Sequence, residues 1–354
     1  MKRVVHVVGT GTIGEPLIGL LVEHKRELGI DEVTFHKRTP TPLDQPKIKD
    51  LIRRGAKLCV DEGARAGFQA MDLETSHESE DAIERAQVII DCTPSGNSMK
   101  ESVYSKYDDG RRLFVAQGSE FGFGKPYARG INDETLRHGE ERFLQVVSCN
   151  THNISAVIQT VALEPHGDDN LERGRFHCLR RANDISQAGS FIPAPEVGKH
   201  GDPRFGTHHA RDAYHLYLTK GLDLDLFSSA MKMNTQYMHI IHFALTLRRP
   251  TSRETIVEQI KSNDRLSRTN QSSAGVVFSF GRDHGHYGRI LNQTVFALPT
   301  LHISENGREV SGYCFTPQDG NSLLSSAAAA VWHFYPDETV ERLDCLRPFF
   351  FSEV

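Results

Sequence analysis

Residues 3–14 read RVVHVVGTGTIG, an apolar run that leads into a glycine-rich turn. The β-branched residues of the run predict a strand, and the residues at 13–27 predict a helix. Gly9, Gly11 and Gly14 between them have the spacing of a dinucleotide-binding turn. Such glycines permit a tight turn and a close backbone approach, while the helix N-terminus receives the pyrophosphate. A glycine-rich turn without a ligand is the alternative interpretation.

An alternation of strands and helices continues through the first half of the chain. Further strands are expected at 32–36, 87–91 and 113–116, and helix-like residues at 82–86 precede the second of these. The strand at 87–91 is apolar on both faces, as a buried parallel strand is. This pattern predicts an α/β unit with a Rossmann-type parallel sheet.

The second half of the chain has longer strand patterns and an antiparallel signal. Strands are expected at 174–181, 237–247, 275–280, 291–298, 301–304 and 309–315. Asn306 and Gly307 between the last two form a strong hairpin signal. Thr251 and Glu254 form a capping-box pattern that opens a helix through Lys261. The second half is therefore expected to be a mostly antiparallel α+β domain.

Length and composition narrow the classes of function. At 354 residues the chain exceeds the usual limit of one hydrophobic core, so two domains are expected. The formal net charge of −5 and the scattered Lys and Arg residues argue against a nucleic-acid partner. No stretch approaches the roughly 18 apolar residues of a membrane helix, and no signal peptide is visible. The six cysteines are widely spread without a CxxC pair, which predicts reduced thiols in a cytoplasm.

A basic turn of His36, Lys37, Arg38 and Thr39 follows the second expected strand. NAD-selective sites place an acidic residue about 20 positions after the glycines, where it binds the ribose hydroxyls. Lys37 and Arg38 would instead suit a 2′-phosphate, which favours NADP over NAD. A solvated basic turn is the alternative.

Ser148, Cys149, Asn150 and Thr151 follow an apolar strand pattern at 143–147. A cysteine at the head of a helix can be a nucleophile with a lowered pKa. A cysteine at such a position is more often a small buried residue, so the assignment depends on its partners.

Three polar segments supply candidate partners for that cysteine: Arg180 and Arg181 in a strand, Thr207, His208 and His209 in a glycine- and proline-rich loop, and Tyr237, Met238 and His239 at the start of an apolar strand. Each is weak alone, because paired arginines and histidines are usually solvated and a strand histidine is usually a core residue. Two clusters of histidine and aspartate, at 208–215 and 283–286, lack a dedicated ligand spacing, so no metal site is expected.

Together, these segments make the chain similar to the type II, archaeal-type glyceraldehyde-3-phosphate dehydrogenase family over most of its length. The matching pieces are GTGTIG at 9–14, DCTPSG at 91–96, AQGSE at 116–120, VSCNT at 147–151, RRA at 180–182, THHA at 207–210, YMH at 237–239 and PQD at 317–319. Their order and approximate spacing match as well, so the combination is far more specific than any single piece.

The resemblance implies roles for these residues. Cys149 would be the nucleophile and His239 the general base, and the histidine and the helix N-terminus would favour the thiolate. The implied dinucleotide contacts are Thr12, Ile13, Gly118, Arg181 and Gln318, with Lys37 on the cofactor phosphate. The implied substrate contacts are Ser148, Asn150, His208 and His209, to which we add the neighbouring Thr151 and Arg180 as candidates. Arginine and histidine are the residue types needed to bind phosphate groups.

The implied activity is the reversible, NAD(P)-dependent oxidation of glyceraldehyde 3-phosphate to 1,3-bisphosphoglycerate. A thioester on Cys149 would be resolved by inorganic phosphate as co-substrate. The family is homotetrameric, and its C-terminal helix returns to the cofactor domain, a part that the alanine-rich residues 322–332 can play. We therefore expect a dinucleotide-binding domain at 1–148 and 318–354, and a catalytic domain at 149–317.

Departures from the family pattern leave the aldehyde open. His152 and Asn153 replace a threonine and a small residue, and GSEF at 118–121 replaces a typical GGEK, changes that are expected around the substrate. A paralogue that acts on another phosphorylated or phosphonylated aldehyde would keep Cys149 and His239. Two further functions are compatible with the same residues: a dehydrogenase whose thioester is resolved by water, and a catalytically idle, dinucleotide-sensing interaction protein.

Overall fold

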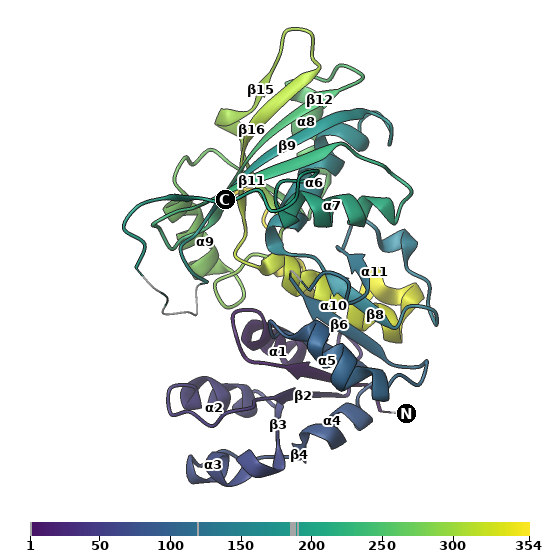
Figure 1. The fold of residues 1–354 in the computed structure, drawn as a ribbon, viewed down its shortest axis with the longest axis vertical. Coiled ribbons are helices and arrows are strands. Elements are labelled where there is room, and N and C mark those ends of the chain that lie inside the picture. Colours follow the sequence, from purple (N-terminus) through teal and green to yellow (C-terminus); the bar gives the residue numbers. More distant parts are fainter. Residues whose placement is uncertain (1, 119, 185–188, 190) are drawn as a thin grey trace. The chain divides into compact units, whose positions relative to one another are not determined.

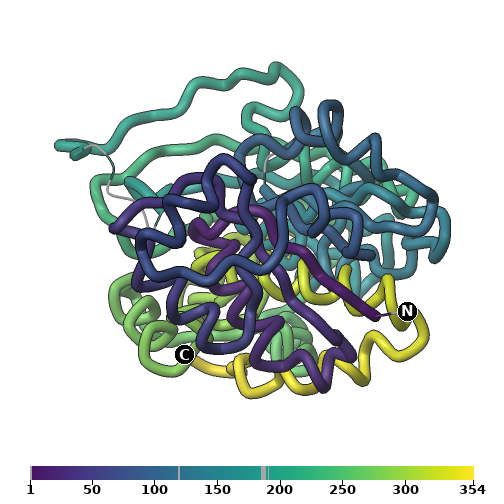
Figure 2. The backbone as a smooth tube through the Cα atoms, turned by 90° about the horizontal axis from the view of Figure 1, so that it is seen from below, coloured from purple at the N-terminus to yellow at the C-terminus, as the bar shows by residue number. Residues whose placement is uncertain are grey.

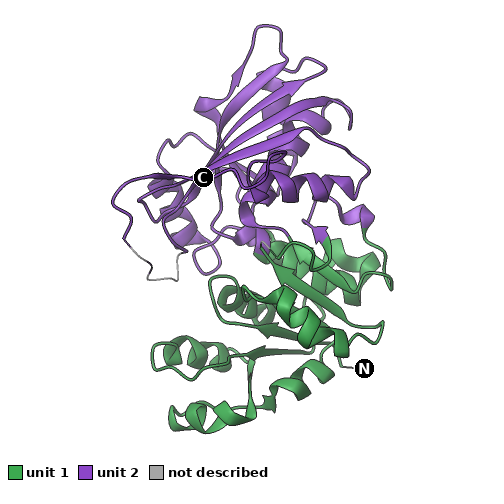
Figure 3. Ribbon diagram, viewed as in Figure 1, with its two compact units in different colours: residues 1–125, 136–146, 323–347 green, residues 126–135, 147–322, 348–354 purple. Residues whose placement is uncertain are grey.

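The computed structural model describes residues 2–118, 120–184, 189 and 191–354. These residues form two compact units (Figure 3). Unit 1 comprises Met1–Lys125, Leu136–Val146 and Leu323–Arg347, and unit 2 comprises Pro126–Thr135, Val147–Ser322 and Pro348–Val354. In this part of the chain, no helix is long and apolar enough to cross a membrane.

Unit 1 is built on a parallel sheet (Figure 1). Its strands are β1 (Val4–Val8), β2 (Glu32–His36), β3 (Lys57–Val60), β4 (His77–Glu78), β5 (Val88–Asp91), β6 (Leu113–Gln117) and β8 (Phe143–Val146), with the short β7 (Lys125–Tyr127) next to β8 at the edge. The order is β4-β3-β2-β1-β5-β6-β8-β7, and the pairs from β4 to β8 are parallel. The predicted Rossmann-type sheet is thus confirmed. The strand order reverses between β1 and β5, which is where such sheets bind ligands.

The helices of unit 1 alternate with these strands. They are α1 (Gly14–Glu23), α2 (Gln45–Arg53), α3 (Arg65–Ala70), α4 (Ser79–Arg85), α5 (Gly96–Ser102), α10 (Gly320–Phe334), which enters unit 1 at Leu323, and α11 (Thr339–Arg342). The segment after α10 lies against the turn that precedes β2, because the Tyr335 hydroxyl donates to the carbonyl oxygen of Gly29 at 3.2 Å (Figure 2). Residues 323–347, near the end of the sequence, therefore pack in the same unit as the first strands of the chain.

Unit 2 contains the predicted, mostly antiparallel sheet. Its strands are β9 (Leu171–Arg180), β10 (Glu196–Val197), β11 (Leu226–Lys232), β12 (His239–Leu247), β13 (Leu266–Thr269), β14 (Thr294–Ala297), β15 (His302–Ile303) and β16 (Glu309–Thr316). The order is β10-β11-β9-β12-β16-β14-β13, and β15 pairs with β16 as the expected hairpin. Only β9 with β11 and β13 with β14 are parallel among the described pairs. The helices are α6 (Cys149–Ile158), α7 (His208–Leu218), α8 (Arg253–Ser262) and α9 (Ala274–His284).

The prediction of a strand at 275–280 is wrong, because these residues lie within α9. A short apolar run does not distinguish a strand from a helix by itself. The residues of α9 that are buried, Val277 and Gly281, lie four positions apart, which is the spacing of one helical face.

Two helix starts also differ from the sequence prediction. Helix α8 is capped by Ser252, whose hydroxyl accepts the backbone N–H of Thr255 at 3.2 Å, so the box predicted from Thr251 is displaced by one residue. His208 and His209 do not lie in a loop but form the first turn of α7. The helix fixes both rings on one short, rigid segment.

Candidate active site

Each glycine in the glycine-rich turn of unit 1 has a different structural role. Gly9 has a φ of +94°, in the region that L side chains rarely adopt. A Cβ at Gly14 would lie 2.1 Å from the Gly9 carbonyl oxygen, whereas a Cβ at Gly11 would meet no protein atom within 4 Å. Thr12 and Ile13 lie between them, with Ile13 directly before α1. The first and third glycines are required by the backbone, and the second leaves open space beside a helix N-terminus. These features fit a dinucleotide pyrophosphate.

The other expected cofactor residues of unit 1 follow strands of the same parallel sheet. Lys37 and Arg38 come directly after β2, and Gly118 comes directly after β6 with a φ of +67°. Parallel strands end at one edge of a sheet, so these residues lie at the edge that carries the glycine turn. Lys37 is ion-paired to Asp44 at 2.7 Å, and Arg38 is exposed. Ser119, part of the AQGSE piece, lies outside the described residues.

Alanine substitutions in the glycine turn are expected to separate folding from binding. Gly14→Ala forces a Cβ into the Gly9 carbonyl and should destabilise the protein by about 1–3 kcal/mol, as overpacking does. Gly11→Ala should leave the melting temperature unchanged but weaken dinucleotide binding about tenfold or more, which is 1.4 kcal/mol. Thermal unfolding and isothermal titration calorimetry check the two effects. Unchanged binding by the Gly11→Ala variant would contradict this placement of the pyrophosphate.

Cys149 is the first residue of α6, as its sequence context predicts. Ser148 caps this helix, because its hydroxyl accepts the backbone N–H of Thr151 at 3.3 Å. The two hydroxyls of Ser148 and Thr151 are 2.9 Å apart. The helix dipole at this position favours a negative charge on the sulfur.

Asn150 connects the cysteine to the histidines of α7. Its amide nitrogen lies 3.4 Å from Nε2 of His209, and its amide oxygen accepts the Thr316 hydroxyl at 3.0 Å. His209 is buried, and its Nδ1 lies 3.0 Å from the Thr207 hydroxyl. The structure thus brings His209, which is 59 positions away in the sequence, into contact with the residue that follows Cys149.

His239 begins β12, and its side chain is buried. Its Nδ1 accepts the backbone N–H of Arg181 at 3.0 Å. Burial, reinforced by the positive charges of Arg181 and Arg180, lowers the pKa of His239 to about 3, so the ring is neutral near neutral pH. Because Nδ1 accepts a hydrogen bond, the neutral ring carries its proton on Nε2. In this state His239 can donate a hydrogen bond from Nε2.

Arg181 and Asp319 form a buried ion pair, and Asp319 is a site residue to which the sequence reasoning gave no role. A guanidinium nitrogen of Arg181 lies 2.9 Å from Asp319 and 3.0 Å from Asp184. Burial alone would raise the pKa of Asp319, but the charge and hydrogen bond of Arg181 lower it to about 2, so the carboxylate is ionised. Gln318 and Asp319 have φ values of +40° and +67°, and such strained backbone is frequent at functional sites. The PQD motif at 317–319 was the feature of the sequence from which a role for Asp319 could have been predicted.

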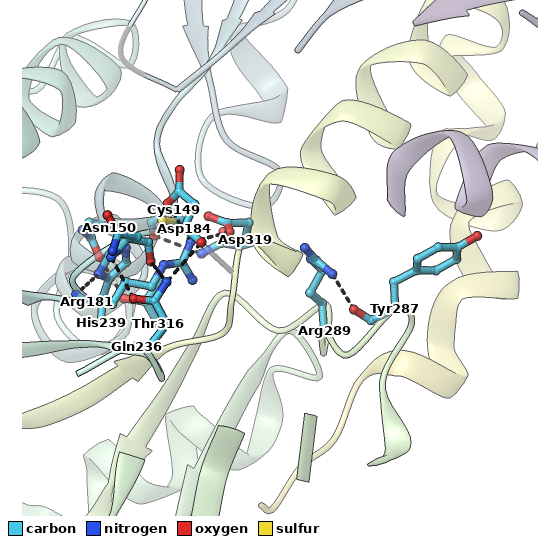
Figure 4. A network of polar contacts seen from close by, with 12 residues as sticks. Cys149, Asn150, Arg181, Asp184, Gln236, His239, Tyr287, Arg289, Thr316 and Asp319 are labelled. Atoms are coloured by element: carbon cyan, nitrogen blue, oxygen red, sulfur yellow. Dashed lines mark hydrogen bonds and ion pairs between the residues drawn. The ribbon is translucent and has the colours of Figure 1, made fainter. Parts of the chain in front are cut away.

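The environment of the Cys149 sulfur is different from the one expected. Figure 4 shows Cys149 close to Asp319 and Arg181. Burial raises the pKa of the Cys149 thiol well above its usual value, the Asp319 carboxylate raises it further, and Arg181 opposes them. The expectation that His239 and the helix N-terminus produce a low thiol pKa is therefore wrong for this resting arrangement. Desolvation and the neighbouring carboxylate are larger effects.

Asp319→Asn is expected to make the Cys149 thiol more reactive. The change removes the charge that raises the thiol pKa but keeps an oxygen that can accept from Arg181. Alkylation by iodoacetamide at neutral pH should become at least several-fold faster, because a lower pKa increases the thiolate fraction. Peptide mass spectrometry identifies the alkylated cysteine. Asp184→Asn, at the half-exposed partner of Arg181, is the matched control and should change the rate much less. An equal or slower rate for Asp319→Asn would contradict the assignment.

A cationic cavity of about 420 Å³ lies within unit 2 beside the start of α7. Its lining includes the expected Arg180, His208 and His209 together with Lys199 and Arg211, which the sequence reasoning missed because no motif contains them. Burial, followed by the charges of Arg180 and Arg211, lowers the pKa of His208 to about 4. The lining also contains one carboxylate, that of Asp202. The net positive charge of the cavity therefore comes from one lysine and two arginines, and the neutral histidines add N–H donors. Within the described residues, no three His, Cys, Asp or Glu side chains are grouped so that they could hold a metal ion.

Several curated archaeal proteins are similar to this chain over most of its length. No protein-family model matches the chain. A glyceraldehyde-3-phosphate dehydrogenase of Hyperthermus butylicus is 28% identical over 323 residues, which are 88% of this chain and 86% of that protein. Proteins of the same name from Sulfurisphaera tokodaii and Sulfolobus acidocaldarius are 24% and 26% identical, over 88% and 73% of this chain and 86% and 73% of theirs. The similarity of this chain to archaeal-type glyceraldehyde-3-phosphate dehydrogenases is thereby confirmed over most of its length.

Proposed function

We propose that this protein is an NAD(P)-dependent aldehyde dehydrogenase that converts glyceraldehyde 3-phosphate to 1,3-bisphosphoglycerate through a thioester on Cys149. One observation carries the proposal: Asn150, next to Cys149, contacts His209, which lines the cationic cavity. A nucleophile and an anion-binding cavity are thus connected within one unit. The names of the archaeal relatives support an oxidoreductase of this type.

We assign cofactor binding to unit 1 and chemistry to unit 2. Gly9, Gly11, Gly14, Thr12 and Ile13 would bind the pyrophosphate, and Gly118 would approach the dinucleotide through its bare backbone. Lys37 and Arg38 would contact the 2′-phosphate of NADP, and the glycine turn would accept the pyrophosphate of either NADP or NAD. The family resemblance implies Arg181 and Gln318 as further cofactor contacts. When bound, the nicotinamide would accept the hydride from the substrate.

Cys149 would add to the aldehyde carbon as a thiolate, which requires loss of the thiol proton. The positive charge of Arg181 and the N-terminus of α6 stabilise that anion against burial and Asp319. In the hemithioacetal that forms, the Nε2–H of His239 can donate to the substrate oxygen. To act as general base, the ring must instead carry its proton on Nδ1, which ends the hydrogen bond from Arg181. His239 and Arg181 would therefore change together during the reaction.

Inorganic phosphate would resolve the thioester and release an acyl phosphate. Arg180, Lys199 and Arg211 supply the charges that bind phosphate groups, and His208 and His209 supply hydrogen bonds. Attack of a phosphate oxygen on the acyl carbon breaks the carbon–sulfur bond and returns the thiolate of Cys149. The same steps in reverse reduce an acyl phosphate.

Two residues that depart from the family pattern lie deeper than the sequence suggested. His152 and Asn153 were expected around the substrate, but both are buried in α6. The Asn153 amide donates to Thr316 at 2.9 Å, and Thr316 donates to Asn150. Asn153 can therefore affect substrate choice through the position of Asn150. A related phosphorylated or phosphonylated aldehyde is the second candidate substrate, while the homotetramer and the cytoplasmic location are proposed from the family resemblance.

The proposal is tested by following cofactor reduction with glyceraldehyde 3-phosphate, NADP or NAD, and with or without inorganic phosphate. We expect phosphate-dependent turnover that is lost in Cys149→Ala and retained in Cys345→Ala, a half-buried cysteine of unit 1. Turnover that does not need phosphate would indicate a thioester resolved by water. Intact dinucleotide binding without turnover on this or related aldehydes would favour the idle, cofactor-sensing protein.

A further inference from the structure

Asp44 lies between two lysines after the end of β2. Its carboxylate oxygens are 2.7 Å from the ammonium group of Lys37 and 2.7 Å from that of Lys47. The Thr41 hydroxyl donates to the same carboxylate at 2.7 Å. The three charged side chains are only 20–26% exposed, so water screens their interaction less than it screens a fully exposed pair.

The carboxylate stays ionised in this arrangement. Burial alone would raise the pKa of Asp44, but hydrogen bonds from Lys37, Lys47 and Thr41 lower it well below its usual value. Of the two residues that flank Lys37, Arg38 is exposed, and Nε2 of His36 lies 3.2 Å from Asp61. Burial lowers the pKa of His36 below its usual value. Asp44 is therefore the acidic group that contacts the lysine expected to bind a cofactor phosphate.

The end of the second strand is where dinucleotide-binding sheets contact the adenosine ribose. A 2′-phosphate at this position would need the positive charge of Lys37, and that charge is already compensated by Asp44. The phosphate would also be repelled by the carboxylate, because like charges close together disfavour each other. The ribose hydroxyls of NAD carry no charge, so they neither need the charge of Lys37 nor are repelled by the Asp44 carboxylate.

We propose that Asp44 is a specificity-determining residue. Its carboxylate competes with the 2′-phosphate of NADP for Lys37 and so lowers the affinity for NADP relative to NAD. The inference rests on the proposed dinucleotide site of unit 1. It predicts that removal of the carboxylate charge increases NADP affinity selectively. Lys37 and Lys47 would then both be available to the phosphate.

The test is calorimetric titration of the resting protein with NADP and with NAD, without an aldehyde. Asp44→Asn should tighten NADP binding about tenfold and change NAD binding less than about twofold, giving a tenfold change in the ratio of the two Kd values. Lys37→Gln should weaken NADP binding, and it should remove the effect of Asp44→Asn in the double variant. Asp50→Asn is the matched control, because Asp50 of α2 also contacts two cations, Arg53 and Arg54, but not Lys37.

The outcomes separate this inference from the proposed function. An unchanged or lower NADP-to-NAD affinity ratio in Asp44→Asn, with both cofactors bound, would overturn the competition while leaving the cofactor site in place. Absence of dinucleotide binding by the unmodified protein would instead refute the site itself. If Asp44→Asn lowers the melting temperature, Asp44→Ser and the Lys37→Gln titration provide the same comparison, and an unaffected ratio in both would overturn the proposal.

Discussion

Arg181 contacts three parts of unit 2 at once, and the candidate site depends on these contacts. Its backbone N–H binds His239, and its guanidinium binds Asp319 and Asp184 in a largely buried position. Loss of one partner from a buried ion pair typically costs about 3–5 kcal/mol, because the other charge is left uncompensated. One residue therefore sets the tautomer of the histidine, keeps the carboxylate ionised and moderates the thiol pKa. Burial and the Asp319 carboxylate favour the protonated thiol of Cys149, and Arg181 opposes them.

In the cationic cavity, the histidines are neutral and the positive charge lies on other side chains. Burial removes the proton from the histidines, so their imidazoles act as neutral donors. The positive charge of the lining comes from Arg180, Lys199 and Arg211. An anionic group can then bind beside histidines that carry no charge. This division suits a site in which the nucleophile and the anion-binding groups must keep different protonation states.

The sequence predicts those parts of the molecule whose cause is local. The glycine turn is recognisable because a strand, three glycines and a helix follow one another, and β5 is recognisable because its residues are apolar on both faces. The run at 275–280 has no such local signal, and its helix depends on tertiary packing. The ion pair of Arg181 with Asp319 joins two motifs that are distant in the sequence, so the effect of Asp319 on Cys149 could not be read from either. Lys199, which lines the cavity, lies in a segment without a motif, so its place there could not be predicted from the sequence either.

We propose that Cys149 carries the acyl group during turnover. Intact-protein and peptide mass spectrometry can detect this group after the protein is mixed with NADP and glyceraldehyde 3-phosphate in phosphate-free buffer. We expect an acyl adduct on Cys149 that accumulates without phosphate and disappears when phosphate is added. Cofactor reduction without any adduct on Cys149, or an adduct on another cysteine, would contradict it.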